Sequence, residues 1–194
     1  MTLLARFFVQ PKTAAVEAIE RQNWRGGWMV FALSFALACL FHVCLPESFE
    51  AQVYEKLHPH RFLYWLRMLA VSGSAELLDA LLLWTLLKCA RSAIRPLEVV
   101  VFAAWLHVYD LAARGLMILA ACLDLAWFFK ASETALSLWG AAAAIVGISR
   151  IAGTSILRSL FLMSVSAAGV VGLFYFLFVR GIISAATLDA LIFR

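Results

Sequence analysis

Charged side chains are scarce in this sequence. Asp, Glu, Lys and Arg make up 14% of its 194 residues, whereas hydrophobic residues make up 64%. A soluble domain typically has about 25% charged and about 45–50% apolar residues. A chain this short cannot enclose so much apolar surface in a core surrounded by water, so an ordinary soluble domain is excluded. We therefore expect an all-α polytopic membrane protein with a single transmembrane domain.

The sequence has few cysteines, and none of them are closely paired. Cys39, Cys44, Cys89 and Cys122 lie in or beside apolar stretches, and no Cys-x-x-Cys occurs. This absence excludes the common zinc-binding and thiol-redox patterns. We expect thiols that are unreactive and buried like small hydrophobic side chains.

A dense basic run is also missing. The formal net charge is +4 at pH 7, but Lys and Arg are spread along the chain and do not alternate with aromatic residues. A nucleic-acid surface would need such a cluster, so we expect no nucleic-acid partner and attribute the positive charge to membrane topology.

Catalytic motifs are absent from the sequence as well. It contains no phosphate-binding glycine loop, no His-Glu-x-x-His and no Gly-x-Ser-x-Gly. His58 and His60 share a segment with three glutamates, but this set favours a solvated loop over a zinc site. We expect no enzymatic activity, no cofactor and no bound metal.

Five apolar blocks predict five transmembrane helices, at about 27–45, 65–87, 98–122, 133–149 and 156–179. Each is close to the length of about 20 residues that one crossing needs. The third block continues apolar over 97–129, which as one straight helix would reach roughly 50 Å. We expect its span to end near Cys122; a kink near Gly115 is the alternative.

Residues 1–25 predict a short amphipathic segment on the cytoplasmic membrane surface. Leu3, Leu4, Phe7 and Phe8 flank Arg6 in its first part. After Pro11, Thr13 is the expected N-cap of a second short helix.

The distribution of Lys and Arg predicts the orientation. With five crossings, nine of these residues fall on the side of the N-terminus and five on the other side: Arg6, Lys12, Arg21, Arg25, Lys88, Arg91, Arg95, Arg150 and Arg158 against Lys56, Arg61, Lys130, Arg180 and Arg194. The positive-inside rule then puts the N-terminus in the cytoplasm and the C-terminus outside.

Small residues recur at helix-packing spacing in the last two blocks. The fourth block carries Gly140 and Ala144, and likewise Ala143 and Gly147, four residues apart; the fifth carries Ser164, Ala168 and Gly172. Such ladders let helix backbones approach closely in lipid, so we expect them to pack against helices of this chain or of a partner.

Ionisable residues inside the second and third blocks form a candidate polar cluster. His107, Asp110 and Arg114 fall within about 60° on a helix, and the spacing of Asp110 and Arg114 permits a direct ion pair. Glu76 and Asp79 share a face of the preceding helix, which is expected to lie antiparallel beside the third. Counting from the helix ends places Asp79 and His107 roughly 14 Å deep, near the middle of the bilayer.

Each such charge costs roughly 2.5–3.5 kcal/mol at a helix centre, so we expect the cluster to face inward, away from lipid. Three carboxyl groups then face one arginine and one histidine, and burial favours the neutral form of at least one of them. The cluster is interpreted first as a set of staples between two helices. The alternative is a proton relay or ion site.

The order of features resembles the Yip-domain family of five-span membrane proteins in its compact bacterial form. The residues that carry the resemblance are Phe7-Phe8, Pro11, Thr13 and Ile19 before the first span, Trp139, Ala144-Ile145-Val146-Gly147-Ile148, Ser155 and Leu160. The resemblance implies five spans and a bacterial inner membrane. The long N-terminal region with Asp-Leu-Tyr-Gly-Pro of eukaryotic members is missing, so their binding of prenylated small GTPases does not carry over.

Together these features predict a non-enzymatic membrane scaffold or accessory subunit. It would bind membrane lipid and other membrane proteins, or a second copy of itself, through its small-residue helices. The alternative is a small transporter or ion-coupled permease that uses the intramembrane polar cluster.

Overall fold

The structure is a computed structural model, and it describes residues 2–21, 23–44, 61–123 and 125–184. Within these ranges every regular element is an α-helix. The helices are α1 (Leu3–Val9), α2 (Pro11–Glu20), α3 (Trp24–Cys44), α5 (Arg61–Cys89), α6 (Pro96–Cys122), α7 (Ala126–Ala152) and α8 (Ile156–Val179). His58, His60 and the side chains of Cys39 and Cys44 lie outside the described residues.

Four helical segments are long and apolar enough to cross a membrane: Leu69–Cys89, Pro96–Cys122, Lys130–Ala152 and Ile156–Val179. The shortest has 21 residues and reaches about 31 Å, which matches a hydrocarbon layer of about 30 Å. A soluble protein of this size does not need four helices that are apolar over the full thickness of a membrane. They indicate an integral membrane protein, and the predicted all-helical fold class is confirmed.

The helix bounds agree with some predicted spans and extend others. The last span, predicted over 156–179, coincides with α8. The chain is helical through Gly115, and the end of α6 at Cys122 divides the long third block. α7 begins at Ala126, well before the predicted 133, because a helix need not end where the hydrocarbon does.

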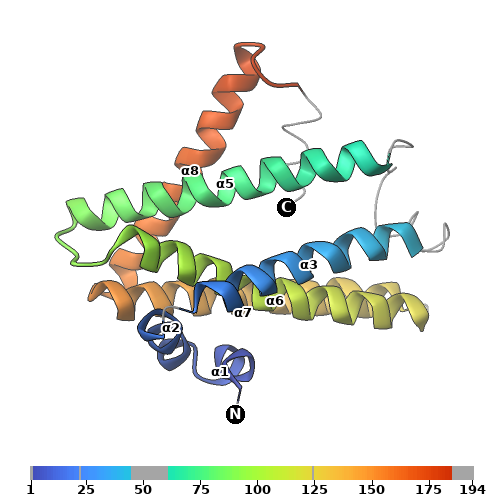
Figure 1. Ribbon diagram of the computed structural model, residues 1–194, viewed down its shortest axis with the longest axis horizontal. Coiled ribbons are helices and arrows are strands. Elements are labelled where there is room, and N and C mark those ends of the chain that lie inside the picture. The colour runs from blue at the N-terminus through green and yellow to red at the C-terminus, as the bar shows by residue number, and fades with distance from the viewer. Residues whose placement is uncertain (1, 22, 45–60, 124, 185–194) are drawn as a thin grey trace.

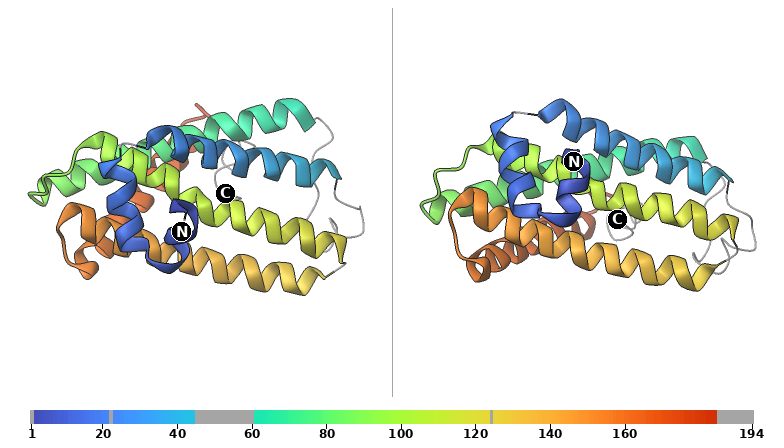
Figure 2. Two further views of the ribbon diagram at one scale, coloured as in Figure 1. Left: turned by 60° about the horizontal axis from the view of Figure 1, so that its bottom comes forward. Right: turned by 90° about the horizontal axis from the view of Figure 1, so that it is seen from below.

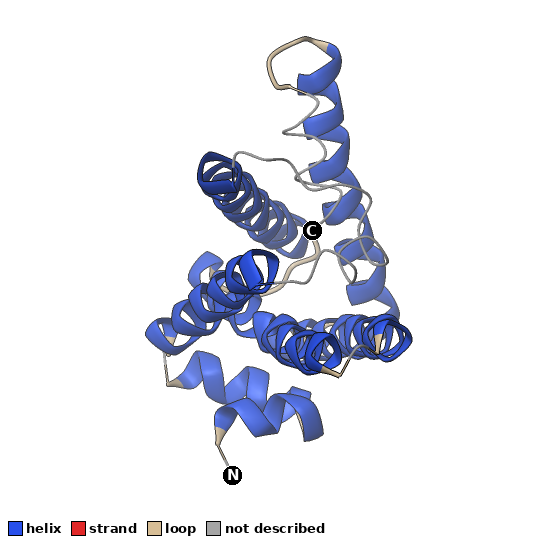
Figure 3. Cartoon of the chain, turned by 90° about the vertical axis from the view of Figure 1, so that its right-hand side faces the viewer, coloured by secondary structure: helices blue, strands red, loops and turns tan. Residues whose placement is uncertain are grey.

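The long helices form a layered bundle. α3, α6 and α7 lie side by side, α5 lies on one side of this layer, and α1 and α2 lie on the other (Figures 1 and 3). α8 packs against α7 and then crosses α5 at a steep angle (Figure 1). α6 is central, since it contacts α3, α5 and α7 as well as both short N-terminal helices.

α3 packs closely against α6 through its first turn. The Trp105 Nε1–H donates to the carbonyl oxygen of Asn23 at 3.0 Å, and a Cβ at Gly27 would lie 3.1 Å from the Ala104 Cβ. α3 runs in the same direction as α6 (Figure 1) but begins level with Trp105, about 14 Å further along than Pro96. One end of α6 therefore projects beyond α3.

The N-terminal segment folds as two short helices that lie across α6 and α7 (Figure 2). Phe7 is fully buried and stacks on Trp105 with a ring-centroid distance of 5.6 Å. The Tyr109 hydroxyl donates to the Phe7 carbonyl, and the Trp139 Nε1–H donates to the Phe8 carbonyl at 3.2 Å. The apolar side of the N-terminal segment thus faces the bundle. The contact of this segment with the membrane surface stays a prediction.

Two predictions about residues at helix ends are wrong. Thr13 is not an N-cap, because α2 already begins at Pro11, where the fixed φ of proline suits the first helical position. Cys89 and Cys122, predicted to be buried, are exposed. Each lies at the last residue of its helix, where fewer neighbouring helices cover it.

Candidate functional site

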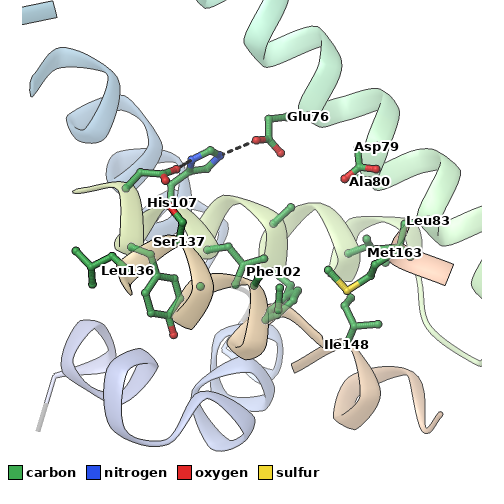
Figure 4. Close-up of a pocket in the computed structure, with 18 of the residues that line it drawn as sticks. Glu76, Asp79, Ala80, Leu83, Phe102, His107, Leu136, Ser137, Ile148 and Met163 are labelled. Carbon is green, nitrogen blue, oxygen red and sulfur yellow. Dashed lines mark hydrogen bonds and ion pairs between the residues drawn. The ribbon is translucent and has the colours of Figure 1, made fainter. Parts of the chain in front are cut away.

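A cavity of about 330 Å³ lies between α5 and the layer of α6 and α7, with Met163 of α8 closing one side (Figure 4). Glu76 and Asp79 line it from α5, and His107 and Asp110 line it from α6. The remaining wall is mostly alanine, leucine and other apolar side chains. Four of the five residues of the predicted polar cluster therefore border one space.

His107 is at the centre of this cluster. Its Nδ1 lies 2.6 Å from Asp110 Oδ2, and its Nε2 lies 3.3 Å from Glu76 Oε1 (Figure 4). The edge-to-face contact of its ring with Phe31 holds the ring in place. A neutral imidazole can donate to one of these carboxylates, whereas an imidazolium can donate to both. Movement of one proton would therefore change which carboxylate is bound.

Exposure differs across the cluster. The His107 and Glu76 side chains are 14% and 21% exposed, whereas that of Asp110 is 56% exposed. Glu76 and His107 thus face inward between α5 and α6, as predicted. Asp110 was also expected to face inward, but its side chain lies at the open side of the cavity.

Asp79 binds a different helix from the one predicted. The Ser166 hydroxyl of α8 donates to Asp79 Oδ1 at 2.6 Å, and Ser166 is fully buried. A Cβ at the neighbouring Gly169 would lie 2.7 Å from Leu82 Cδ2, so the Leu82 side chain packs directly on the α8 backbone here. Asp79 therefore joins α5 to α8. The residue of α5 that contacts His107 is Glu76, not Asp79.

The expected ion pair of Asp110 and Arg114 is not formed. Asp110 turns to His107, and Arg114 Nη1 lies 3.5 Å from the Met117 sulfur. Side chains on a helix lean toward its N-terminus, which brings Asp110 toward the preceding turn and His107. Among the described residues, Arg114 has no carboxylate within ion-pair distance.

Metal binding is not suggested by this geometry. Within the described parts of the chain, no group of three or more His, Cys, Asp and Glu side chains is arranged to hold an ion. The cluster is suited instead to hydrogen bonding and proton exchange, and its two contacts from α5 staple that helix to α6 and α8.

The two small-residue ladders are used differently. On α7, Ala144 is buried, a Cβ at Gly147 would lie 2.4 Å from Phe102, and one at Gly140 would lie 3.2 Å from Tyr109. This ladder packs against α6 of the same chain. On α8, Ser164, Ala168 and Gly172 are all exposed, and a Cβ at Gly172 would meet nothing within 4 Å.

The inward side of α8 explains why its ladder is exposed. Ser159, Leu162, Ser166, Val170 and Phe174 are its buried residues, at spacings of three and four. At about 100° per residue, Ala168 lies nearly opposite Ser166 and Val170. The small residues therefore lie on one face of α8, whereas α8 packs against the bundle through the opposite face.

The fold and the four candidate spans define a helical integral membrane protein with a polar cavity between its helices. Comparison with protein-family models, with characterised proteins and with solved structures finds no match. The likeness to the Yip-domain family stays a prediction.

Replacing Gly147 with alanine should destabilise the bundle, because the new methyl group forces the Phe102 ring to move. Overpacking of this kind costs about 2 kcal/mol, which lowers Tm by about 5 °C in a chain of this size. Thermal unfolding in mild detergent would measure the change. Gly172→Ala is the matched control, and a comparable loss there would contradict the open face of α8.

Proposed function

We propose that this chain is a non-enzymatic scaffold or accessory subunit of a bacterial inner membrane, which binds another transmembrane helix through α8. The exposed ladder of Ser164, Ala168 and Gly172 carries the proposal. Positions that face only lipid gain nothing from small side chains, whereas a partner helix gains close backbone contact. The partner is a transmembrane helix with a small-residue face, on another protein or on a second copy of this chain.

The surroundings of the ladder support a helix partner. Phe161, Leu173 and Phe176 of α8 are large, apolar and about half exposed or more. At about 100° per residue, Phe176 lies about 80° to one side of the strip of small residues, and the exposed Leu160 lies about 80° to the other side. A helix seated on the strip would pack between them, with the van der Waals contact that drives association in lipid.

The proposed membrane arrangement has five spans, with α3 as the first. α3 has 21 residues, about 31 Å, and it packs along α6 with the close contact described above. Five crossings, together with the bias of Lys and Arg, put the N-terminus and the end of α5 in the cytoplasm and the end of α6 outside.

A second candidate function is ion-coupled transport through the polar cavity. The observation that favours it is the placement of His107 between Glu76 and Asp110 beside an open space of about 330 Å³. A proton shared by such a set can move between groups when a cation enters or leaves.

Thiol labelling tests the topology. In variants that keep either Cys89 or Cys122 as the single cysteine, a membrane-impermeant maleimide applied to intact cells should label Cys122 and leave Cys89 unlabelled. Cys89 should react after permeabilisation, which serves as the control. Labelling of both or of Cys89 alone would refute the proposed threading.

Leucine substitution on the outward face of α8 tests the scaffold function. Ala168→Leu and Gly172→Leu should convert a native complex to the free chain on blue-native electrophoresis, because leucine holds the partner backbone away. Val179→Leu, on an exposed site at the helix end, should leave the complex intact. A wild-type chain that migrates as a monomer in native lipid would contradict the proposal, and tagged copies would distinguish self-association from another partner.

Proton flux into proteoliposomes tests the second candidate. With an imposed membrane potential and an entrapped pH dye, Asp110→Asn should lower the flux about tenfold or more, since it removes a charged partner worth about 1.5–3 kcal/mol. Thr85→Val, on the exposed side of α5, is the control. Equal flux in the wild type, Asp110→Asn and empty liposomes would leave the cluster with its structural role.

A further inference from the structure

Five cations gather at the end of the bundle where two helical connections meet. Lys88, Arg91 and Arg95 lie at the turn from α5 to α6, and Arg150 and Arg158 lie beside the turn from α7 to α8; all five are exposed. The two turns touch, since the Ser92 hydroxyl donates to the Ala152 carbonyl at 3.0 Å. We call these five residues the basic surface.

The basic surface lacks neutralising partners within the described part of the chain. No described carboxylate lies within ion-pair distance of any of the five cations. Glu98 is close in sequence, but its Oε2 accepts a hydrogen bond of 2.7 Å from the Arg95 backbone N–H. Because all five basic side chains are exposed, their positive charge is directed outward.

Arg91 occupies a backbone conformation that favours glycine. Its φ is +63°, and it follows the last turn of α5, with hydrogen bonds from its N–H to Lys88 and from the Ser92 N–H to Leu87. The equivalent positions after α7 and α8 are Gly153 and Gly181, with φ of +65° and +69°. An L side chain is strained there, so the presence of arginine points to a use for its side chain.

The turn that carries Arg91 and Arg95 is held firmly. Ile94 is buried, its carbonyl accepts a hydrogen bond from Trp84 Nε1, and its N–H donates to the Ser92 hydroxyl. The backbone beneath the two guanidinium groups is therefore fixed, which lowers the entropy lost when they bind an anion.

We propose that the basic surface binds the phosphate groups of anionic phospholipids in the adjoining leaflet. All five cations lie at or just beyond the ends of the candidate spans, which is where lipid phosphates are found. Guanidinium groups bind phosphate oxygens in pairs, and each cation at an anionic membrane surface adds about fivefold to binding. This site is independent of the proposed partner face on α8.

Lipid-dependent thermal stability of the full chain tests the proposal. The purified protein in neutral detergent is titrated with phosphatidylglycerol, phosphatidylcholine or inorganic phosphate, and Tm is followed. Phosphatidylglycerol alone should raise Tm. Equal stabilisation by phosphatidylcholine would overturn the proposal, and so would equal stabilisation by inorganic phosphate, which would assign the surface to a soluble anion.

Arg91→Gly separates the two effects of this side chain. Without anionic lipid its Tm should rise by a few degrees because the strain is relieved, whereas its affinity for phosphatidylglycerol should fall about fivefold. Arg91→Lys should retain most of that affinity, and Lys130→Gln at the opposite end should retain all of it. Wild-type affinity in Arg91→Gly combined with Arg150→Gln would overturn the proposal.

Discussion

The central position of α6 is the constraint on which the rest of the structure depends. Lipid offers no hydrogen bonds, so every polar group on a spanning helix needs a partner from a neighbouring helix or a route to water. α6 meets this need on separate faces. Phe102, Trp105 and Tyr109 receive α7 and the N-terminal helices, while His107 faces α5. Because each face is matched to a different neighbour, α6 determines where α3, α5, α7 and the two N-terminal helices lie.

Much of this arrangement is predictable from composition and spacing. The apolar blocks predict the helices to within a few residues at most ends, since hydropathy and helix length are local properties. The pairing of the second and third blocks through ionisable groups is also predictable, because an ionisable side chain inside a span must turn away from lipid and toward a polar group on a neighbouring helix. Glu76 and His107 do meet, with 3.3 Å between Glu76 Oε1 and His107 Nε2.

The exact polar partners depend on helix crossing angles, which no local pattern contains. Asp79 and Glu76 share a face of α5. Because α8 crosses α5 at a steep angle, Asp79 accepts a hydrogen bond from Ser166 of α8, whereas Glu76 contacts His107 of α6. The close contact of α3 with α6 was not predicted, although the Gly26-Gly27 pair is a signal that could have indicated it, since only glycine allows the Trp105 ring so close. The N-terminal helices were recognised as amphipathic, but a face of Ala14, Ala15 and Ala18 that is fully buried against the bundle carries almost no hydrophobic signal of its own.

Under the proposed five-span threading, the unequal helix lengths decide how deep the cluster lies. α6 has 27 residues, about 40 Å, and so exceeds the hydrocarbon by about 10 Å. Since α3 begins level with Trp105, the excess must fall at the Pro96 end of α6. His107 then lies only a few ångströms inside the hydrocarbon, and Asp110, three residues further along α6, lies about 5 Å deeper. The same excess spans the headgroup layer and holds the basic surface at its outer edge, within reach of lipid phosphates. Under this threading the cluster is less deep than a count from the helix ends places it, because such a count treats the end of a helix as the edge of the membrane.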